Sequence, residues 1–195
     1  MTIDLNTAKP QFDVIPQGTI VTLQMTIRRG GAGNDGWLKR STTDKGDSLG
    51  LDCEFVVVDG DFAKRKFWQQ YTLEGTTQGH AEAGEFSKTT LRAMVESARG
   101  IRPDDRSEAA NAVRDISSWG DLNQIRFMAR LGVKPAQGTY RAQNTIVEVI
   151  TPDRLDWKKP QQVDLTALAA SPATAPTATT PPAGAILRTE WSKAK

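Results

Sequence analysis

Apolar and polar side chains alternate along residues 21–28, and this pattern restricts the fold more than any other feature of the sequence. The apolar positions are Val21, Leu23, Met25 and Ile27. A repeat of two residues is that of a β-strand with one buried and one solvated face. The alternation therefore predicts a half-buried strand over residues 18–29.

Four further segments have the composition of strands. LGLDCEFVVV (residues 49–58) and DFAKRKFWQQYTL (61–73) predict a hairpin, because the Asp-Gly pair between them is a common turn sequence. IRFMARLGV (125–133) and TYRAQNTIVEVI (139–150) predict a second hairpin around the turn KPAQG.

Two helices are expected between these hairpins. Ser87 is a candidate N-cap for SKTTLRAMVESARG, and Gly100 can end that helix. Its expected buried stripe is Leu91, Met94, Val95 and Ala98. Asp105 and Glu108 resemble a capping box for SEAANAVRDI. The stripe of this second helix is expected at Ala109, Ala112, Val113 and Ile116.

The order of three strands, a helical insert and two strands is typical of the OB-fold, a five-stranded barrel with a helix between its third and fourth strands. We therefore predict a mainly β, OB-fold-like domain over residues 1–160. A parallel α/β sheet is disfavoured, because its helices would alternate with single strands.

Residues 161–195 differ in character from this domain. They are rich in Pro, Ala and Thr and predict a disordered tail, because they contain too few large apolar residues to form a core. The tail ends in AILRTEWSKAK, in which Trp191 is a candidate partner-binding residue. A frayed terminus is the alternative interpretation of this end.

Composition narrows the classes of function. The formal net charge is only +2, so nucleic-acid binding would depend on where the cations lie. The single cysteine, Cys53, cannot form an intramolecular disulfide, which favours a cytoplasmic protein. No segment has the length of a membrane span, and the N-terminus does not resemble a secretion signal.

Residues suited to catalysis or metal binding are few. His80 is the only histidine, and we expect it to be solvated in the polar loop TTQGHAEAGE. The close carboxylates Asp104-Asp105 are expected to cap a helix, and Asp52 with Glu54 to lie on the polar side of a strand. We therefore expect no enzyme, no cofactor and no metal site.

The loop RRGGAGNDGWLKR (residues 28–40) contains Gly31, Gly33 and Gly36 in the spacing G-x-G-x-x-G. In dinucleotide-binding proteins this spacing joins a strand to a helix, whose N-terminus holds the pyrophosphate. Here the following sequence, WLKRSTTDKGDSLG, leads to another strand. We interpret the pattern as a mobile glycine-rich loop with an exposed Trp37, flanked by cations.

Basic and aromatic residues interleave in four segments that an OB-fold would bring to one sheet face and its flanking loops. Cations neutralise phosphates, and aromatic rings stack on unpaired bases. The candidate nucleic-acid-binding residues are Arg28, Arg29, Trp37, Lys39, Arg40, Lys64, Lys66, Trp68, Arg126, Arg130, Tyr140 and Arg141. For each cation alone, a solvated surface residue is the alternative.

The segment KRKFWQQY (residues 64–71) carries an aromatic residue on both faces of the expected strand. We predict that Phe67 and Tyr71 pack inward, and that Trp68 with Lys64 and Lys66 points toward ligand.

Three stretches resemble a family of bacteriophage single-stranded DNA-binding proteins, formerly described as phage proteins of unknown function. They are IPQGTIVTLQM, CEFVVVDGDFAKRKFWQQYTL and IRFMARLGVKPAQGTYRAQNTIVEVITP, within residues 15–152. The resemblance implies an OB-fold that coats single-stranded DNA, and Arg65, Trp68 and Asn144 match the family by position. One departure is the basic C-terminal end EWSKAK, where bacterial single-stranded DNA-binding proteins usually have an acidic tip.

These features together predict a non-catalytic, largely sequence-independent single-stranded DNA-binding protein of phage DNA replication or recombination. The alternative is an adaptor protein that recruits a replication or host partner through its tail. A small nuclease is disfavoured for want of a metal-ligand or nucleophile cluster. Homo-oligomerisation and the choice between DNA and RNA stay open.

Overall fold

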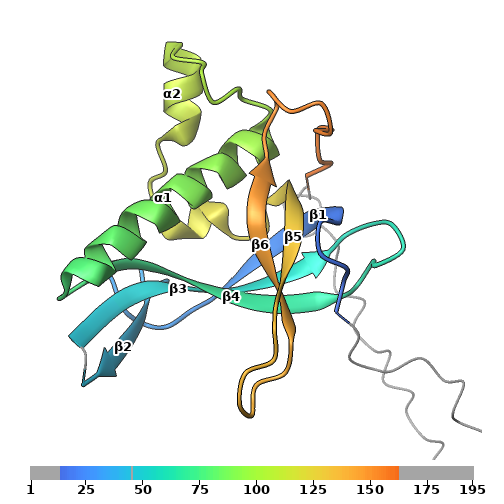
Figure 1. Ribbon diagram of the computed structural model, residues 1–195. Coiled ribbons are helices and arrows are strands. Elements are labelled where there is room, and N and C mark those ends of the chain that lie inside the picture. The colour runs from blue at the N-terminus through green and yellow to red at the C-terminus, as the bar shows by residue number, and fades with distance from the viewer. Residues whose placement is uncertain (1–13, 45, 163–195) are drawn as a thin grey trace, which may run out of the picture. The chain divides into compact units, whose positions relative to one another are not determined.

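The computed structural model describes residues 14–44 and 46–162 (Figure 1). They form a mainly β fold with one six-stranded sheet, two α-helices and a short 3-10 helix. The predicted mainly β class is confirmed. Trp191 and the tail beyond residue 162 lie outside the described residues.

The sheet is antiparallel throughout. Its strands are β1 (Ile20–Arg28), β2 (Lys39–Thr43), β3 (Gly46–Val57), β4 (Lys66–Gly75), β5 (Arg126–Lys134) and β6 (Gln143–Ile150). The neighbour order is β2-β3-β1-β5-β6, and β4 pairs with the other edge of β3. All five expected strands are present. The short strand β2, which pairs with the first residues of β3, was not predicted.

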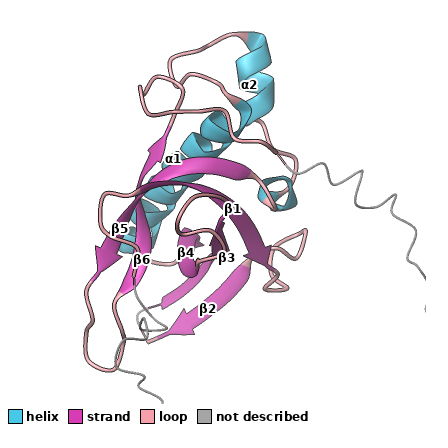
Figure 2. Ribbon diagram, turned by 90° about the vertical axis from the view of Figure 1, so that its right-hand side faces the viewer, coloured by secondary structure: helices cyan, strands magenta, loops and turns pink. Residues whose placement is uncertain are grey.

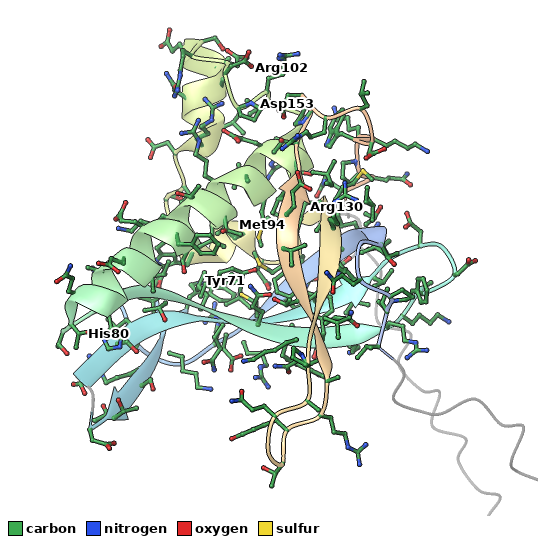
Figure 3. The ribbon with its side chains drawn as sticks, in the orientation of Figure 1. Tyr71, His80, Met94, Arg102, Arg130 and Asp153 are labelled. Carbon is green, nitrogen blue, oxygen red and sulfur yellow. The ribbon has the colours of Figure 1, made fainter. Side chains whose placement is uncertain are left out.

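The alternation in β1 separates core from surface as expected. Val21, Leu23, Met25 and Ile27 are buried. On β3 and β4 the core is aromatic: the Phe55 ring lies 5.3 Å from that of Phe67 and 6.3 Å from that of Tyr71, between centroids. Figure 3 shows Tyr71 and Met94 in the space between the sheet and the first helix.

The edges of β4 and β6 lie against each other without a ladder of main-chain hydrogen bonds in the described part of the chain. We call this junction the seam. It is bridged by Gln69, whose side-chain oxygen accepts hydrogen bonds from the Ile146 amide at 3.1 Å and the Thr145 hydroxyl at 3.0 Å. The sheet is therefore open, with a side chain where a closed barrel would have paired strands.

Asn144, at the start of β6, has a structural role. Its buried side chain accepts a hydrogen bond from the Ile15 amide at 2.9 Å and donates to the Ile15 and Gly132 carbonyls. These bonds attach the segment before β1 to the sheet. Asn144 matched the family resemblance by position, and its side chain is engaged in these structural hydrogen bonds.

The helix α1 (Gln78–Arg99) follows β4 and covers the sheet. It begins nine residues before the predicted cap Ser87, because Thr77 is the N-cap and accepts a hydrogen bond from the His80 amide. The predicted stripe of Leu91, Met94, Val95 and Ala98 is buried, as expected. The expectation for His80 was wrong: it lies half-buried in the first helical turn, not in a loop.

The second helix, α2 (Glu108–Arg114), is short and mostly exposed. Ser107 caps it in place of the predicted Asp105, and only Ala110 is buried, so the predicted stripe was wrong. The helix is held to α1 by an ion pair of 2.7 Å between Arg114 and the buried carboxylate of Glu96. A 3-10 helix, η1 (Trp119–Leu122), then leads into β5.

Candidate nucleic-acid interface

The polar side chains of β1, β3 and β4 share one face of the sheet, which we call the outer face. It comprises Gln24, Thr26 and Arg28 of β1, Asp52 and Glu54 of β3, and Lys66, Trp68 and Gln70 of β4. These residues alternate with the core residues, so they point away from the core and from α1. The strand register sets them in cross-strand rows, such as Trp68 opposite Glu54 and Glu54 opposite Thr26.

Trp68 is the main apolar feature of the outer face. Its side chain is 49% exposed, although it lies in the middle of β4 with polar neighbours on both sides. Phe67 and Tyr71 are buried and Lys66 is exposed, as the alternation predicted. Lys64 belongs instead to the turn before β4, where it has a positive φ of 69°. The outer face therefore presents a tryptophan ring to solvent.

Arg28 and Lys39 converge on one carboxylate. Arg28 donates two hydrogen bonds to Asp52, at 2.9 and 2.8 Å, and the Lys39 ammonium lies 3.0 Å from the same carboxylate. Burial alone would raise the pKa of the Asp52 carboxyl, but the hydrogen bonds from Arg28 and Lys39 outweigh it and hold the pKa below its usual value. Asp52 therefore stays ionised and fixes two cations side by side.

A second ion pair lies one row further along the face. The Lys66 ammonium lies 2.8 Å from a carboxylate oxygen of Glu54. Asp52 and Glu54 thus lie on the polar side of a strand, as expected. The two carboxylates pair with three predicted site cations, Arg28, Lys39 and Lys66, and so partly neutralise their charge. The sequence alone did not reveal these pairs.

The loop between β1 and β2 is anchored to η1. Asp35 accepts hydrogen bonds from the Ser118 hydroxyl at 2.7 Å and the Trp119 amide at 3.2 Å. The hydroxyl hydrogen bond from Ser118 holds the pKa of the Asp35 carboxyl below its usual value. Ala32 and Leu38 exchange main-chain hydrogen bonds across the loop. The loop is therefore tied to η1 by Asp35 and closed by its own main-chain hydrogen bonds.

The three glycines of the G-x-G-x-x-G spacing shape this loop. Gly31, Gly33 and Gly36 have φ values of 76°, 78° and 72°, in the left-handed region that side chains disfavour. The strand β2 follows the loop, so no helix N-terminus is available for a pyrophosphate. The glycines thus serve the turn geometry, and mobility is not needed to explain them.

Trp37 is half-buried, not exposed as expected, and packs against the core. The guanidinium of Arg29 lies over its ring, 4.2 Å from the centroid. This contact holds Arg29 beside the end of β1 through a cation–π interaction. Arg29 and Trp37 therefore form one unit at the border of the outer face.

The predicted residues of β5 are held in polar contacts. Arg126 donates a hydrogen bond to the Gln24 side chain at 2.9 Å, which joins it to the outer face. Arg130 pairs with Glu148 at 3.0 Å and lies near Asp156 at 3.7 Å. Of these two cations, Arg126 is continuous with the outer face, whereas Arg130 belongs to a local ion-pair network.

The β5–β6 hairpin extends beyond β4 on the side away from α1 (Figures 1 and 2). Near its tip Tyr140 is 79% exposed, and Arg141 is exposed beside it. Arg40 is exposed on β2, and no carboxylate of the described residues pairs with it. Exposed rings and cations therefore flank the outer face as well as lying on it.

No group of three or more His, Cys, Asp and Glu side chains in residues 14–44 and 46–162 is placed to hold a metal ion. Over the same residues, no helix is both long enough and apolar enough to cross a membrane. Comparison with known protein families and with curated proteins gave no match to this sequence.

Proposed function

We propose that the protein is a non-catalytic, largely sequence-independent single-stranded DNA-binding protein with an OB-like fold. Support for this proposal comes from the neighbour order β4-β3-β1-β5-β6 in the sheet and from the position of α1 between β4 and β5 in the chain, both of which are compatible with an OB-like fold that is open at the seam. In this arrangement the outer face and the loops beside it correspond to the usual ligand surface.

The observation that carries the proposal is Trp68. A half-exposed indole in the middle of a polar sheet face has a ring available for stacking on a base. Such stacking contributes about 1–3 kcal/mol per base and tolerates any sequence, because every base has a π-face. Arg28, Lys39 and Lys66 lie on the same surface, where they can bind phosphates in addition to their carboxylate partners.

The resemblance to phage single-stranded DNA-binding proteins supports a place in phage DNA replication or recombination. The alternative, an adaptor that recruits a partner through its tail, depends on Trp191, which lies outside the described residues. It therefore remains a prediction without a structural observation behind it.

The test titrates the full chain separately with oligothymidylate, double-stranded DNA and single-stranded RNA. Tryptophan fluorescence is the readout, and each titration is repeated over a series of salt concentrations. We expect quenching by oligothymidylate that weakens steeply with salt, and much weaker binding of the duplex. Absence of binding to oligothymidylate at about 50 mM salt would overturn the proposal, because phosphate contacts are strong under that condition. Preferential binding of RNA would replace DNA as the ligand.

A further inference from the structure

A pocket of about 520 Å³ lies beside the outer face, between the sheet and the segment that follows β6. Residues from β1 and β5 form its floor, and the chain from Lys158 to Gln161 forms one wall. Its lining includes three basic residues, Arg126, Lys158 and Lys159, and one carboxylate, that of Asp59. Only Arg126 of these was expected to belong to a binding site.

Hydrogen bonds set the position of this wall. The Lys158 amide donates to the Met128 sulfur at 3.0 Å, and Arg126 donates to the Gln161 carbonyl at 3.1 Å. The Gln162 side chain accepts a hydrogen bond from the Arg126 amide at 2.9 Å and donates one to the Arg126 carbonyl at 2.8 Å. The two lysines are thus held next to β5 by the main chain around them, while their side chains remain exposed.

The basic residues of this pocket differ from those nearby in their ion pairing. Arg130 and Arg154, further along the same surface, are both paired with Glu148. Among the described residues no carboxylate lies within ion-pair distance of Arg126, Lys158 or Lys159. Three cations without carboxylate partners around a pocket favour an anionic ligand.

The pocket is continuous with the outer face. The strand register places Lys66, Val56, Gln24 and Arg126 in one row across β4, β3, β1 and β5. This row crosses three gaps between strands, or about 15 Å, and ends at the pocket. A single DNA strand that stacks a base on Trp68 and then follows this row would therefore reach Arg126 and the two lysines.

We propose that this pocket binds backbone phosphates of the same single strand, so that the DNA path runs from the outer face over β1 and β5 to Lys158 and Lys159. The inference rests on the proposed function. It assigns phosphate-binding roles to Lys158 and Lys159 and extends the site beyond the sheet face.

The test compares the full chain with its K158A/K159A variant on oligothymidylates of about 8 and about 16 nucleotides, within the range of OB-fold site sizes. The longer oligomer is expected to lose about tenfold in affinity at low salt, and its slope of log K against log salt to fall by about 1.4, or 0.7 per phosphate contact. The shorter oligomer should be affected less, because it can occupy the outer face alone. The matched control, K88A/R106A, removes two exposed cations, one on α1 and one just before α2, and should leave both affinities unchanged.

The outcomes separate the two proposals. If the wild-type chain binds neither oligomer, the proposed function fails. If it binds both, and the K158A/K159A variant keeps the wild-type affinity and salt slope, only the extended path is wrong. Equal losses for both lengths, or for the control variant, would likewise overturn the path, because they indicate a central or a general charge effect.

Discussion

Phe67 and Trp68 are adjacent aromatic residues on β4, yet they lie in opposite environments. Phe67 is 4% exposed and stacks on Phe55 of β3, whereas Trp68 is 49% exposed and faces Glu54. Their own side chains are similarly suited to a core. The neighbouring strand makes the difference, because it offers a ring on one face and a carboxylate on the other. An aromatic residue on a strand is thus interpretable only together with its cross-strand partner.

The largest effect is expected from a change to the buried residue of this pair, Phe67, and it concerns stability. Phe67→Ala should lower the free energy of unfolding by about 3–5 kcal/mol, because it leaves a cavity against Phe55. Chemical denaturation measures the change. The control Phe86→Ala, at a side chain 72% exposed on α1, should stay within about 0.5 kcal/mol of wild type. Similar values for the two variants would contradict the observed packing of β4.

The outer side predicts a loss of binding with little loss of stability. Trp68→Ala should weaken oligothymidylate binding by about 1–3 kcal/mol, since one base loses its stacking partner. Its unfolding midpoint should match that of wild type, and Trp68→Phe should restore part of the affinity. A fall in stability as large as that of Phe67→Ala would mean that Trp68 serves the fold instead.

Asp52 tests whether the outer face is restrained by its own carboxylates. Asp52→Asn removes the charge that holds Arg28 and Lys39, so oligothymidylate affinity should rise by about 1 kcal/mol and depend more steeply on salt. A filter-binding series measures both quantities. Weaker binding in the variant would show that Asp52 positions the two cations for the ligand.

The same variant has a consequence for acid stability. The pKa of the Asp52 carboxyl lies below its usual value in the folded state, because hydrogen bonds from Arg28 and Lys39 outweigh the effect of burial. Its stabilising contribution is therefore present above about pH 4 and is lost as the pH falls through the lower, folded-state pKa. Unfolding followed between pH 2 and 5 should show a shallower pH dependence for Asp52→Asn than for wild type.

The smallest expected effect belongs to the border of the outer face. Arg29→Ala removes the cation that lies over the ring of Trp37. This variant should lower the affinity for oligothymidylate by about 0.5–1 kcal/mol. Trp37 itself is a poorer test, because its half-buried ring also packs against the core. A salt-dependent loss several times larger would make Arg29 a principal phosphate contact.

The sequence predicted those parts of the fold that depend on local periodicity. The alternation of β1 and the stripe of α1 were correct, because a repeat of two or of 3.6 residues follows from burial of one face. The first turns of α1 were missed, since Gly79 and Gly84 lower helix propensity there. Gly84 has a tertiary reason: a Cβ at this position would lie 2.4 Å from the Leu73 carbonyl of β4.

The candidate site was less predictable than the fold. Which cations are paired depends on the register between strands, such as Arg28 opposite Asp52, and this register cannot be obtained from either segment alone. Lys158 and Lys159 join Arg126 only because the chain after β6 turns back along β5. Adjacent lysines in the sequence were a visible signal, but their place beside the sheet was not.

The seam between β4 and β6 also bears on how this protein behaves at high concentration. Strand edges with unsatisfied main-chain groups are templates on which another copy can add a strand, and proteins with such edges aggregate unless the edges are covered. Here the two edges face each other, and the side chain of Gln69 occupies the Ile146 amide. At this seam the glutamine therefore satisfies a main-chain donor that a strand from a second copy would otherwise be able to use.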